Sequence, residues 1–335
     1  MAKSFSFIDL FAGIGGFRRG LERLGGQCKL TCEINPYSRE TYKANYSNGH
    51  QWVYDIHDLD TKTIPECDVI AAGFPCQPFS LAGVSKNNSL GVGTGFQHPT
   101  SGTLFFELKN VIQDLKPKAI ILENVKNIKY LQNGEVFKTI NQVLTEELHY
   151  DMHYEVIDAQ HWVPQHRERI IMVGFSEETD FDFKKIKYPS KKPTLKDILH
   201  PEDGSEMPTP YTDSEGRVLD KYTLTEKVWN YLEYHAEKHR LAGHGFNYGL
   251  FDGDGVGRTL SARYGKDGSE ILIKQDEKRP RRLTPRECAR IMGFDRGMDC
   301  EFQIPVSDTQ AYMQFGNAVV PPVIEAVGKL VIKKI

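Results

Sequence analysis

The sequence predicts an α/β protein in which a parallel sheet is covered by helices on both faces. Short apolar runs alternate with longer amphipathic stretches through the first half of the chain, which is typical of βαβ units. A glycine-rich turn follows the first apolar run, as is common where a strand leads into a helix. A chain of 335 residues with 39% hydrophobic residues can also bury a sizeable core.

The elements of the first half follow from these runs. Consecutive apolar residues predict strands at 5–8, 29–34, 68–72, 119–122 and 170–175. Helices are expected at 17–24, from Pro36 onward, at about 104–116 and at 135–148. Gly25 and Gly26 end the first helix, since glycine readily adopts the conformation that closes a helix. Proline suits the start of the second, because its φ is fixed near the helical value.

The pattern changes after Tyr188. The stretch 189–281 is rich in proline, glycine, aspartate and lysine. We expect one helix in it, at 225–240, and two edge strands, at 259–261 and 271–273. Helices return at 285–292, 310–315 and 320–332. We therefore expect a larger domain built from 1–188 and 282–335, with a smaller, loop-rich domain inserted at 189–281.

Composition limits the classes of function. The 42 lysines and arginines against 45 aspartates and glutamates give a net charge of −3, which excludes a wholly basic binder but allows a local basic groove. No apolar run approaches the ~20 residues of a membrane helix, and the first residues carry no apolar signal region. The six cysteines lack any CxxC pair, and His161 and His166 lack partners at metal-ligand spacing. We expect a cytoplasmic enzyme with no membrane contact and no metal.

The N-terminal turn, Asp9-Leu-Phe-Ala-Gly-Ile-Gly-Gly16, lets the backbone approach a ligand closely. Alone it is compatible with any nucleotide fold, or with a tight turn that binds nothing. Glu33 and Asp55 lie at strand ends, where carboxylates can accept hydrogen bonds from a ribose and from an adenine amine. Together these residues favour a nucleoside cofactor.

Cys76 lies at the centre of Gly73-Phe-Pro-Cys-Gln-Pro-Phe-Ser80, which follows a buried strand and opens a polar loop at 81–100. The carboxyl end of a parallel sheet is where ligands bind, and prolines on both sides stiffen the backbone. A free cysteine is more often buried and inert. Its position and the two prolines favour a nucleophile here.

Several charged or polar positions allow two interpretations. Glu123 emerges from an apolar strand, so burial could raise its pKa and suit it to an acid role, or it could be a solvated carboxylate. Arg167 and Arg169 could clamp an oxygen, or belong to a solvated charge run. The turn at Asn317 could present an amide to a ligand, or only cap a helix. The strongest basic cluster could meet a phosphate backbone or form a solvated face; it comprises Lys278, Arg279, Arg281, Arg282, Arg286 and Arg290.

In this order, the motifs resemble those of the DNA cytosine-5 methyltransferases, over nearly the whole chain. The matching runs are Phe11–Gly16, Gly73–Gln77, Glu123–Val125, Gln165–Arg169, Arg282–Arg290 and Gln314–Asn317. The resemblance implies a doubly wound, Rossmann-like α/β fold of the S-adenosylmethionine-dependent methyltransferases, with a smaller, loop-rich target-recognition domain. It also implies S-adenosylmethionine as methyl donor, no metal, and double-stranded DNA as partner, from which the target cytosine is flipped out.

The resemblance implies roles residue by residue. Cys76 would add to C6 of cytosine, Glu123 would hold and protonate N3, and Arg169 with Arg167 would support O2 of the base and the catalytic loop. Thiolate addition would make C5, otherwise a poor nucleophile, able to attack a methyl group. Gln77 and Ser80 would contact DNA. The cofactor pocket would be lined by Phe11, Gly13, Gly15, Glu33, Ile34, Asp55, Ile56, Thr103, Leu104, Asn317 and Val319.

Further runs, at 80–91, 160–169, 245–249 and 258–273, look like the Dcm-type enzymes, which methylate the inner cytosine of CCWGG. We therefore expect that target, with Arg258 and Arg263 as guanine readers. CCNGG and CCGG are alternative targets, and an RNA substrate or a catalytically silent DNA binder are alternative functions. Two positions depart from the family pattern: Ser101 stands where many members have arginine, and Ile34 where an aromatic often stacks on adenine.

The expected assembly is simple. A clamp of two domains can work as a monomer. The resemblance leaves room for a cognate restriction endonuclease that acts on the same site, without implying a physical complex.

Overall fold

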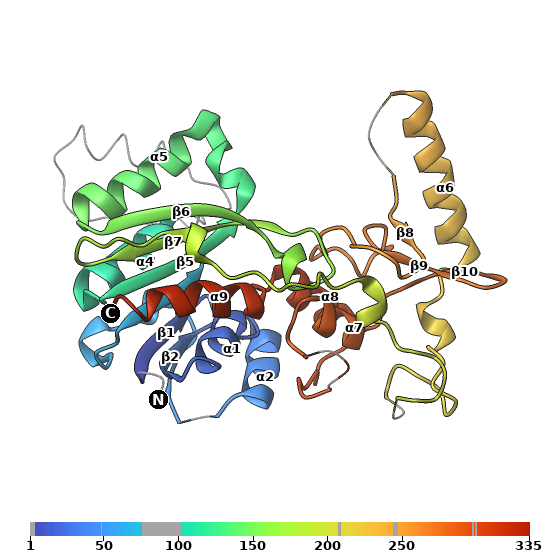
Figure 1. The fold of residues 1–335 in the computed structure, drawn as a ribbon, viewed down its shortest axis with the longest axis horizontal. Coiled ribbons are helices and arrows are strands. Elements are labelled where there is room, and N and C mark those ends of the chain that lie inside the picture. Colours follow the sequence, from blue (N-terminus) through green and yellow to red (C-terminus); the bar gives the residue numbers. More distant parts are fainter. Residues whose placement is uncertain are drawn as a thin grey trace.

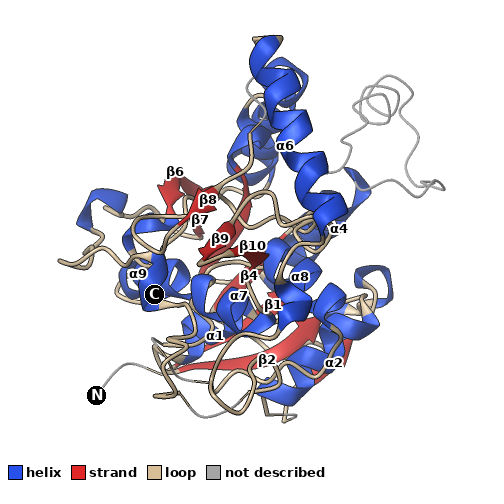
Figure 2. Cartoon of the chain, turned by 90° about the vertical axis from the view of Figure 1, so that its right-hand side faces the viewer, coloured by secondary structure: helices blue, strands red, loops and turns tan. Residues whose placement is uncertain are grey.

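Two lobes are visible in the computed structural model, which describes residues 4–47, 49–75, 102–206, 209–243, 247–296, 298 and 300–335 (Figure 1). The larger lobe holds a seven-stranded sheet, and the smaller one holds a three-stranded sheet. The longest helix of the smaller lobe, α6 (Glu226–Leu241), stands clear of the body (Figure 2).

The seven-stranded sheet has the order β3-β2-β1-β4-β5-β7-β6. Its strands are β1 (Phe5–Leu10), β2 (Gly26–Cys32), β3 (Gln51–Val53), β4 (Val69–Gly73), β5 (Ala119–Val125), β6 (Asp151–Asp158) and β7 (Glu168–Phe175). β1 to β5 run parallel, and the strand order reverses between β1 and β4. Such a reversal opens a crevice at the carboxyl ends of the strands.

One edge of this sheet is antiparallel, which corrects the expectation of a parallel sheet. β7 runs antiparallel to both β5 and β6. The sequence does not predict β6, because only Ile157 of its residues is fully buried and no apolar run marks it. The link at 159–167 is shorter than the roughly dozen residues of a parallel crossover, so the chain folds back on itself.

Helices cover both faces of the large sheet. α1 (Gly16–Glu22) and α9 (Pro321–Val331) pack on one face, and α4 (Gly102–Leu115) and α5 (Glu135–Gln142) on the other. α2 (Pro36–Asn45) begins at the predicted proline, and the Asn35 side chain caps it by accepting from two backbone N–H groups. A π-helical turn at Val143–Glu147 follows α5, within the single helix expected at 135–148. α7 (Pro285–Ile291) and α8 (Asp308–Asn317) lie between the lobes (Figure 1).

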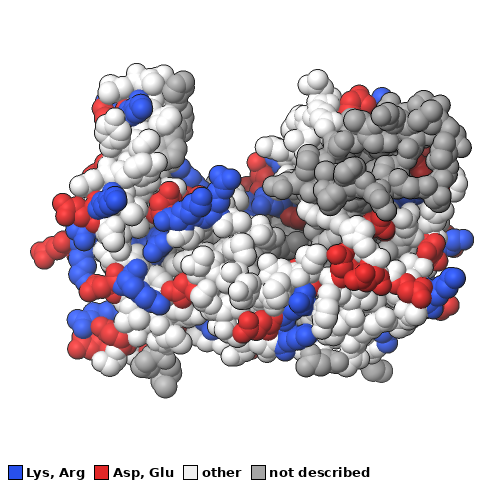
Figure 3. All heavy atoms as spheres, turned by 180° about the vertical axis from the view of Figure 1, so that it is seen from behind, with Lys and Arg blue, Asp and Glu red and all other residues white. Residues whose placement is uncertain are grey.

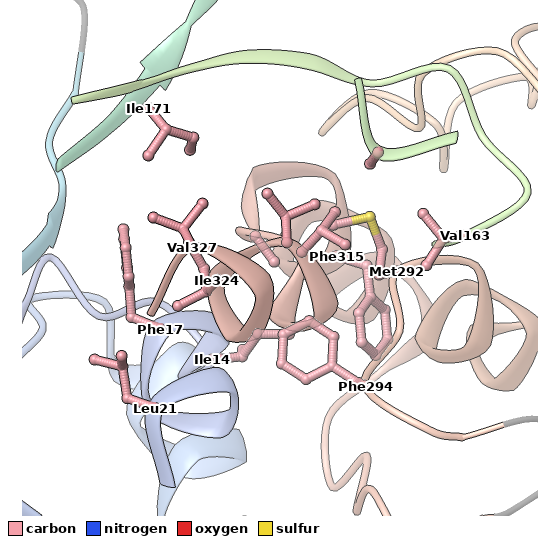
Figure 4. Packing of buried hydrophobic residues seen from close by; sticks show 14 of the residues in the cluster. Ile14, Phe17, Leu21, Val163, Ile171, Met292, Phe294, Phe315, Ile324 and Val327 are labelled. Carbon is pink, nitrogen blue, oxygen red and sulfur yellow. The ribbon is translucent and has the colours of Figure 1, made fainter. Parts of the chain in front are cut away.

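One hydrophobic cluster extends from the α1 and α9 face of the large sheet toward the smaller lobe. Side chains of α1 and α9 meet on one face of the sheet, and Phe294 and Phe315 continue this layer (Figure 4). The same cluster includes Leu260, Tyr264 and Ile271, which come from the 189–281 stretch. This part of the stretch is therefore packed onto the larger lobe instead of hanging from a linker.

The smaller sheet has the order β10-β9-β8, with β8 (Leu250–Phe251), β9 (Leu272–Gln275) and β10 (Lys278–Arg282). The strand expected at 271–273 falls within one residue of β9, and the helix expected at 225–240 is α6. The expectation of a strand at 259–261 is wrong. The N–H of Leu260 donates instead to Oε1 of the Gln165 side chain, at 2.9 Å.

Half of the basic cluster at 278–290 is neither solvated nor free to meet a phosphate backbone. Three of its arginines are buried: Arg281 on β10, and Arg286 and Arg290 on α7, which packs into the core. A buried charge needs an opposite charge, and each of these has one. The ion pairs are Arg281 with Glu287 at 2.8 Å, Arg286 with Asp295 at 2.7 Å and Arg290 with Glu206 at 2.5 Å.

Candidate active site

A cavity of about 850 Å³ opens at the carboxyl ends of β1, β2, β4 and β5. Eight of the eleven residues expected to bind a cofactor line it: Phe11, Gly13, Glu33, Ile34, Asp55, Ile56, Leu104 and Asn317. Gly15 and Val319 are not among the lining residues. The side chain of Thr103 lies outside the part of the chain that the structure describes.

The glycine-rich turn is tied to the end of β2 by Glu33. The N–H of Gly13 donates to one carboxylate oxygen of Glu33 at 2.7 Å, and the N–H of Asn35 donates to the other at 2.7 Å. A Cβ on Gly13 would meet no atom within 4 Å, so the turn faces open space. Each carboxylate oxygen of Glu33 can still accept a further hydrogen bond.

Gly15 and Val319 support this turn from behind. A Cβ on Gly15 would lie 2.4 Å from the ring of Tyr46, whose hydroxyl donates to the Gly15 carbonyl at 2.9 Å. A Cβ on Gly16 would lie 2.4 Å from the Val319 carbonyl oxygen. The link between α8 and α9 therefore approaches the turn so closely that only glycine fits there.

The opposite end of the cavity holds a buried ion pair. β5 carries Glu123 and β7 carries Arg169, and Nε of Arg169 lies 3.1 Å from Oε1 of Glu123. Burial raises the pKa of Glu123, and the guanidinium groups of Arg169 and Arg167 lower it; the balance leaves it above its ordinary value. The carboxyl group is therefore biased toward its protonated form at a position open to a ligand.

The chain enters the expected catalytic loop at this same end. Phe74 and Pro75 line the cavity, and the Asn124 amide donates to the Phe74 carbonyl at 2.9 Å. Cys76, Gln77 and Ser80 lie outside the described residues. Their expected roles therefore remain predictions, although the last described residue before Cys76 borders the Glu123 end of the cavity.

Arg167 is held by backbone carbonyls. Its guanidinium donates to the carbonyl oxygens of Leu260 at 2.9 Å, Gly316 at 2.9 Å and Ala318 at 2.8 Å. It is buried and also borders the cavity. These contacts suit a residue that joins segments more than one that grips a base, whereas Arg169 contacts Glu123 directly.

Backbone and side-chain bonds form a seam between residues 164–167 and 257–260. Pro164 and His166 exchange backbone hydrogen bonds with Gly257, at 2.9 and 2.8 Å, and the Thr259 hydroxyl donates to the His166 carbonyl at 2.6 Å. The buried Gln165 amide donates to the Ile291 carbonyl at 2.9 Å while its oxygen accepts from Leu260. The smaller lobe is thus fastened to the strand that carries Arg169.

Comparison with known proteins places this geometry in a family. The model of the C-5 cytosine-specific DNA methylases matches residues 5–333. The chain belongs to that family. The resemblance drawn from the motifs is therefore confirmed, and the chain is an enzyme of the DNA cytosine-5 methyltransferase class.

Curated relatives agree along almost the full length. The chain is 45% identical to the DNA-cytosine methyltransferase of Escherichia coli (strain K12), over 99% of this chain and 78% of that protein. It is 42% identical to the type II methyltransferase M.NlaX of Neisseria lactamica, over 97% of this chain and 95% of that protein. It is 36% identical to the type II methyltransferase M.HpaII of Haemophilus parainfluenzae, over 100% of this chain and 91% of that protein.

Solved structures agree on the fold of this methylase. The Dnmt2 methyltransferase of S. pombe superposes with a TM-score of 0.71 at 18% identity, covering 98% of both chains. A putative DNA modification methyltransferase from a prophage of E. coli superposes with a TM-score of 0.65 at 20% identity, covering 98% of this chain and 99% of that one. At such identity the likeness shows the fold, which is the expected methyltransferase fold.

The two expected base readers of the methylase are exposed. Arg258 lies within the seam, between Gly257 and Thr259, and its guanidinium donates to the Asn247 carbonyl. Arg263 lies five residues further along, and its side chain makes no hydrogen bond or ion pair with any residue that the structure describes. Figure 3 shows a hollow between the two lobes, with lysine and arginine side chains on the smaller lobe beside it.

The cavity of the methylase also contains residues that the sequence does not single out. Tyr54 lines it with 52% of its surface exposed, and the Arg39 guanidinium lies 4.2 Å from the centre of its ring. Ile34, where the family often has an aromatic, is 66% exposed beside it. Tyr54 precedes the expected Asp55 by one residue, and this adjacency is the one signal that could have identified it.

Two further findings concern the described residues as a group. They contain no cluster of three or more histidine, cysteine, aspartate or glutamate side chains suited to a metal ion. In the same part of the chain, no helix combines the length and apolar character that a membrane span requires.

Proposed function

We propose that this methylase transfers a methyl group from S-adenosylmethionine to C5 of a cytosine in duplex DNA. One observation carries the proposal. A single cavity has the glycine turn and Glu33 at one end and the Glu123–Arg169 pair at the other. A cofactor and a base bound in it would have their reacting atoms side by side, as a direct transfer requires.

The cofactor end fits S-adenosylmethionine. Glu33 has oxygens available to ribose hydroxyls, Asp55 lies at the cavity wall, and Tyr54 and Ile34 offer apolar surface to an adenine. The open space beside Gly13 would admit the rest of the molecule. When bound, the cofactor supplies a methyl group activated by the positive charge on its sulfur.

The other end fits the activation of cytosine. The Cys76 thiolate would form a bond to C6 while Glu123 gives its proton to N3, so that negative charge does not accumulate on the ring. This makes C5 nucleophilic. After methylation, loss of the C5 proton to water and breakage of the Cys76–C6 bond would restore the ring double bond and free the thiolate, and N3 would return its proton to Glu123. Arg169 would hold Glu123 in place throughout.

The base must leave the helix to reach this cavity. C5 and C6 of a paired cytosine lie inside the base stack, and extrusion costs a few kcal/mol, as in other enzymes that act on bases. We propose 1–188 with 282–335 as the catalytic domain, and 189–281 as the recognition domain. The hollow between the lobes would receive the duplex (Figure 3).

We propose the inner cytosine of CCWGG as the target. The resemblance to Dcm-type enzymes and the 45% identity to the DNA-cytosine methyltransferase of E. coli support it. Arg258 and Arg263 are exposed and would read guanines through N7 and O6. CCNGG and CCGG are the alternatives. We also propose that the enzyme works as a monomer, because a clamp of two domains can act alone. A bacterial cytoplasm is its proposed location, because the curated relatives named above are bacterial.

Expression in a host that lacks cytosine methylation tests these proposals together. Bisulfite sequencing of the host DNA should find 5-methylcytosine only at the inner cytosine of CCWGG, and the Cys76→Ser variant should leave none. Methylation in another context would overturn the target and keep the chemistry. No methylation, with intact protein in the cells, would contradict the proposed reaction on DNA, and bisulfite sequencing of host RNA would then test the RNA alternative.

A further inference from the structure

A second cavity, of about 810 Å³, lies on the α1 and α9 face of the large sheet and shares no lining residue with the first. The end of α1, the length of α9 and the segment 185–189 form its walls. We call it the α9 groove and define it by Arg23, Trp162, Tyr188, Glu325 and Lys333. No step of the proposed methyl transfer uses it.

The α9 groove is strongly basic on a chain whose net charge is −3. Among the residues that the structure describes, Glu325 is the only carboxylate that lines it, and it is already within 4.0 Å of Arg23, at 3.3 Å from Arg296 and at 2.7 Å from Lys329. Lys187 and Lys333 are exposed and make no hydrogen bond or ion pair with the described residues. The cations that line the groove are Arg23, Lys185, Lys187, Lys329 and Lys333.

Two arginines outside the groove add to the positive charge at Arg23, one of its lining residues. Burial lowers the pKa of its guanidinium, and the neighbouring Arg296 and Arg19 lower it further, against a smaller opposing effect of Glu325. Cations that destabilise one another at a concave surface attract an anion, because an anion relieves their repulsion.

An aromatic wall accompanies the cations. The Tyr188 ring lies 4.5 Å from the ring of His161 and 5.1 Å from that of Trp162, measured between centroids. Trp162 packs against the main hydrophobic core, so Tyr188 is held from behind, yet half of its surface is exposed. Supported aromatic rings beside a basic groove are how proteins bind unpaired nucleic acid, with phosphates on the cations and bases stacked on the rings.

We propose that the α9 groove binds a single-stranded segment of nucleic acid, with its phosphates at Lys187 and Lys333 and one base on Tyr188. A duplex fits less well, because its bases are stacked on one another and cannot reach the ring. This site is separate from the hollow proposed for the target duplex, and it does not depend on the chemistry proposed for the first cavity.

Fluorescence anisotropy with a labelled oligothymidylate of about 12 nucleotides, a length within known single-strand sites, tests the proposal. The double variant K187E/K333E should bind it at least about tenfold more weakly at low salt, and the slope of log K against log salt should fall by about 1.4. The matched control is K62E/K116E, which reverses two exposed lysines without ion pairs to described residues, near α4 on the other face of the sheet. It should bind as the unchanged protein does.

Variants of Tyr188 test the stacking. Tyr188→Ala should weaken binding roughly tenfold, while Tyr188→Phe, which keeps the ring face, should retain it. Binding of a CCWGG duplex should be unchanged in every variant. The proposal fails if K187E/K333E binds the single strand normally, if the control loses as much, or if duplex binding falls in parallel. Equal melting temperatures would show that each variant is folded.

Discussion

Glu123 is the residue whose environment says most about the chemistry. It is 9% exposed, lies 3.1 Å from the Arg169 guanidinium, and borders the same cavity as the glycine turn. Burial raises its pKa more than the two arginines lower it. A carboxyl group in this state can hold a proton and release it to a bound base, which a solvated carboxylate near neutral pH cannot do.

Glu123→Gln should lower kcat by about 100-fold, because it removes the acidic proton while keeping the shape and a hydrogen-bonding group. Affinity for DNA should stay close to that of the unchanged enzyme. In the unchanged enzyme, kcat should fall as pH rises through the raised pKa of Glu123, since the protonated form is the one required. The rate of methyl transfer in a single turnover, measured at several pH values, checks both expectations. The rate of the Glu123→Gln variant should not fall with rising pH in this way. A near-normal rate would mean that Glu123 only supports the structure.

At the scale of elements, the seam joins the segment proposed for target recognition to the strand that carries Arg169. Residues 164–167 lead into β7, which presents Arg169, and they bond along their length to 257–260, where Arg258 lies. Gln165 is fully buried, and its side chain bonds to two other segments of the chain at once, at Leu260 and at Ile291. A shift of the recognition segment must therefore move the strand that positions Arg169.

Gln165→Leu should lower the free energy of unfolding by about 2–4 kcal/mol, because it leaves the Leu260 N–H and the Ile291 carbonyl buried without partners. It should also lower kcat on the target duplex more than it lowers affinity. Urea unfolding and steady-state kinetics measure the two effects. Gln160→Leu is the matched control, since among the described residues the Gln160 side-chain amide bonds only to the nearby Asp158. A stable Gln165→Leu enzyme with normal kcat would contradict this account of the seam.

The buried Arg281–Glu287 pair anchors α7 and has a defined pH signature. Burial raises the pKa of Glu287, but Arg281, His200 and the Thr284 N–H lower it to about 2. A carboxyl whose pKa is lowered in the folded state stabilises the fold above its unfolded value of about 4.3, and this contribution is lost as pH falls toward 2.

Glu287→Gln should cost about 3–5 kcal/mol at pH 7, because it leaves Arg281 buried without a counter-charge. It should also remove part of the stability loss below pH ~4.3. Chemical denaturation at several pH values measures this. Glu226→Gln, on an exposed residue in the first turn of α6, should cost no more than about 1 kcal/mol. Equal losses of unfolding free energy in the two variants would show that the Arg281–Glu287 pair does not stabilise the fold more than an exposed carboxylate does.

At the scale of the whole molecule, the duplex is expected between two lobes that share one core. The seam and the shared hydrophobic cluster fasten the two lobes to each other, and the hollow lies between them (Figure 3). Basic side chains beside the hollow give attraction to phosphates without making the whole chain basic.

Arg258→Ala should cost about 1–3 kcal/mol of binding on a CCWGG duplex and much less on a random duplex, if Arg258 reads a guanine. Anisotropy with the two duplexes measures the difference. Lys266→Ala is the control, because Lys266 is an exposed lysine of the same segment. An equal loss on both duplexes would make Arg258 a phosphate contact.

Prediction from the sequence succeeded where the signal is local. Apolar runs located β1, β2, β4, β5 and β7, Pro36 located the start of α2, and the glycine turn with Glu33 located the cavity. It failed where a pairing partner, and not an apolar run, decides the outcome. β6 and β10 have no apolar run and form because a neighbouring strand supplies hydrogen bonds. The basic cluster misled because the carboxylates that neutralise Arg286 and Arg290 lie elsewhere in the sequence.

The sequence by itself determined the family, the fold class and most of the residues that line the Glu33 end of the first cavity, because these depend on short motifs whose residues are neighbours in the chain. Only the tertiary structure decided that Glu123 and Arg169 form a buried pair, that Arg167 clamps three carbonyls, and that Gln165 fastens the recognition segment to the sheet. It also decided that five cations line the α9 groove together. Burial and pairing depend on distances between segments far apart in the chain, and those distances exist only once the chain has folded.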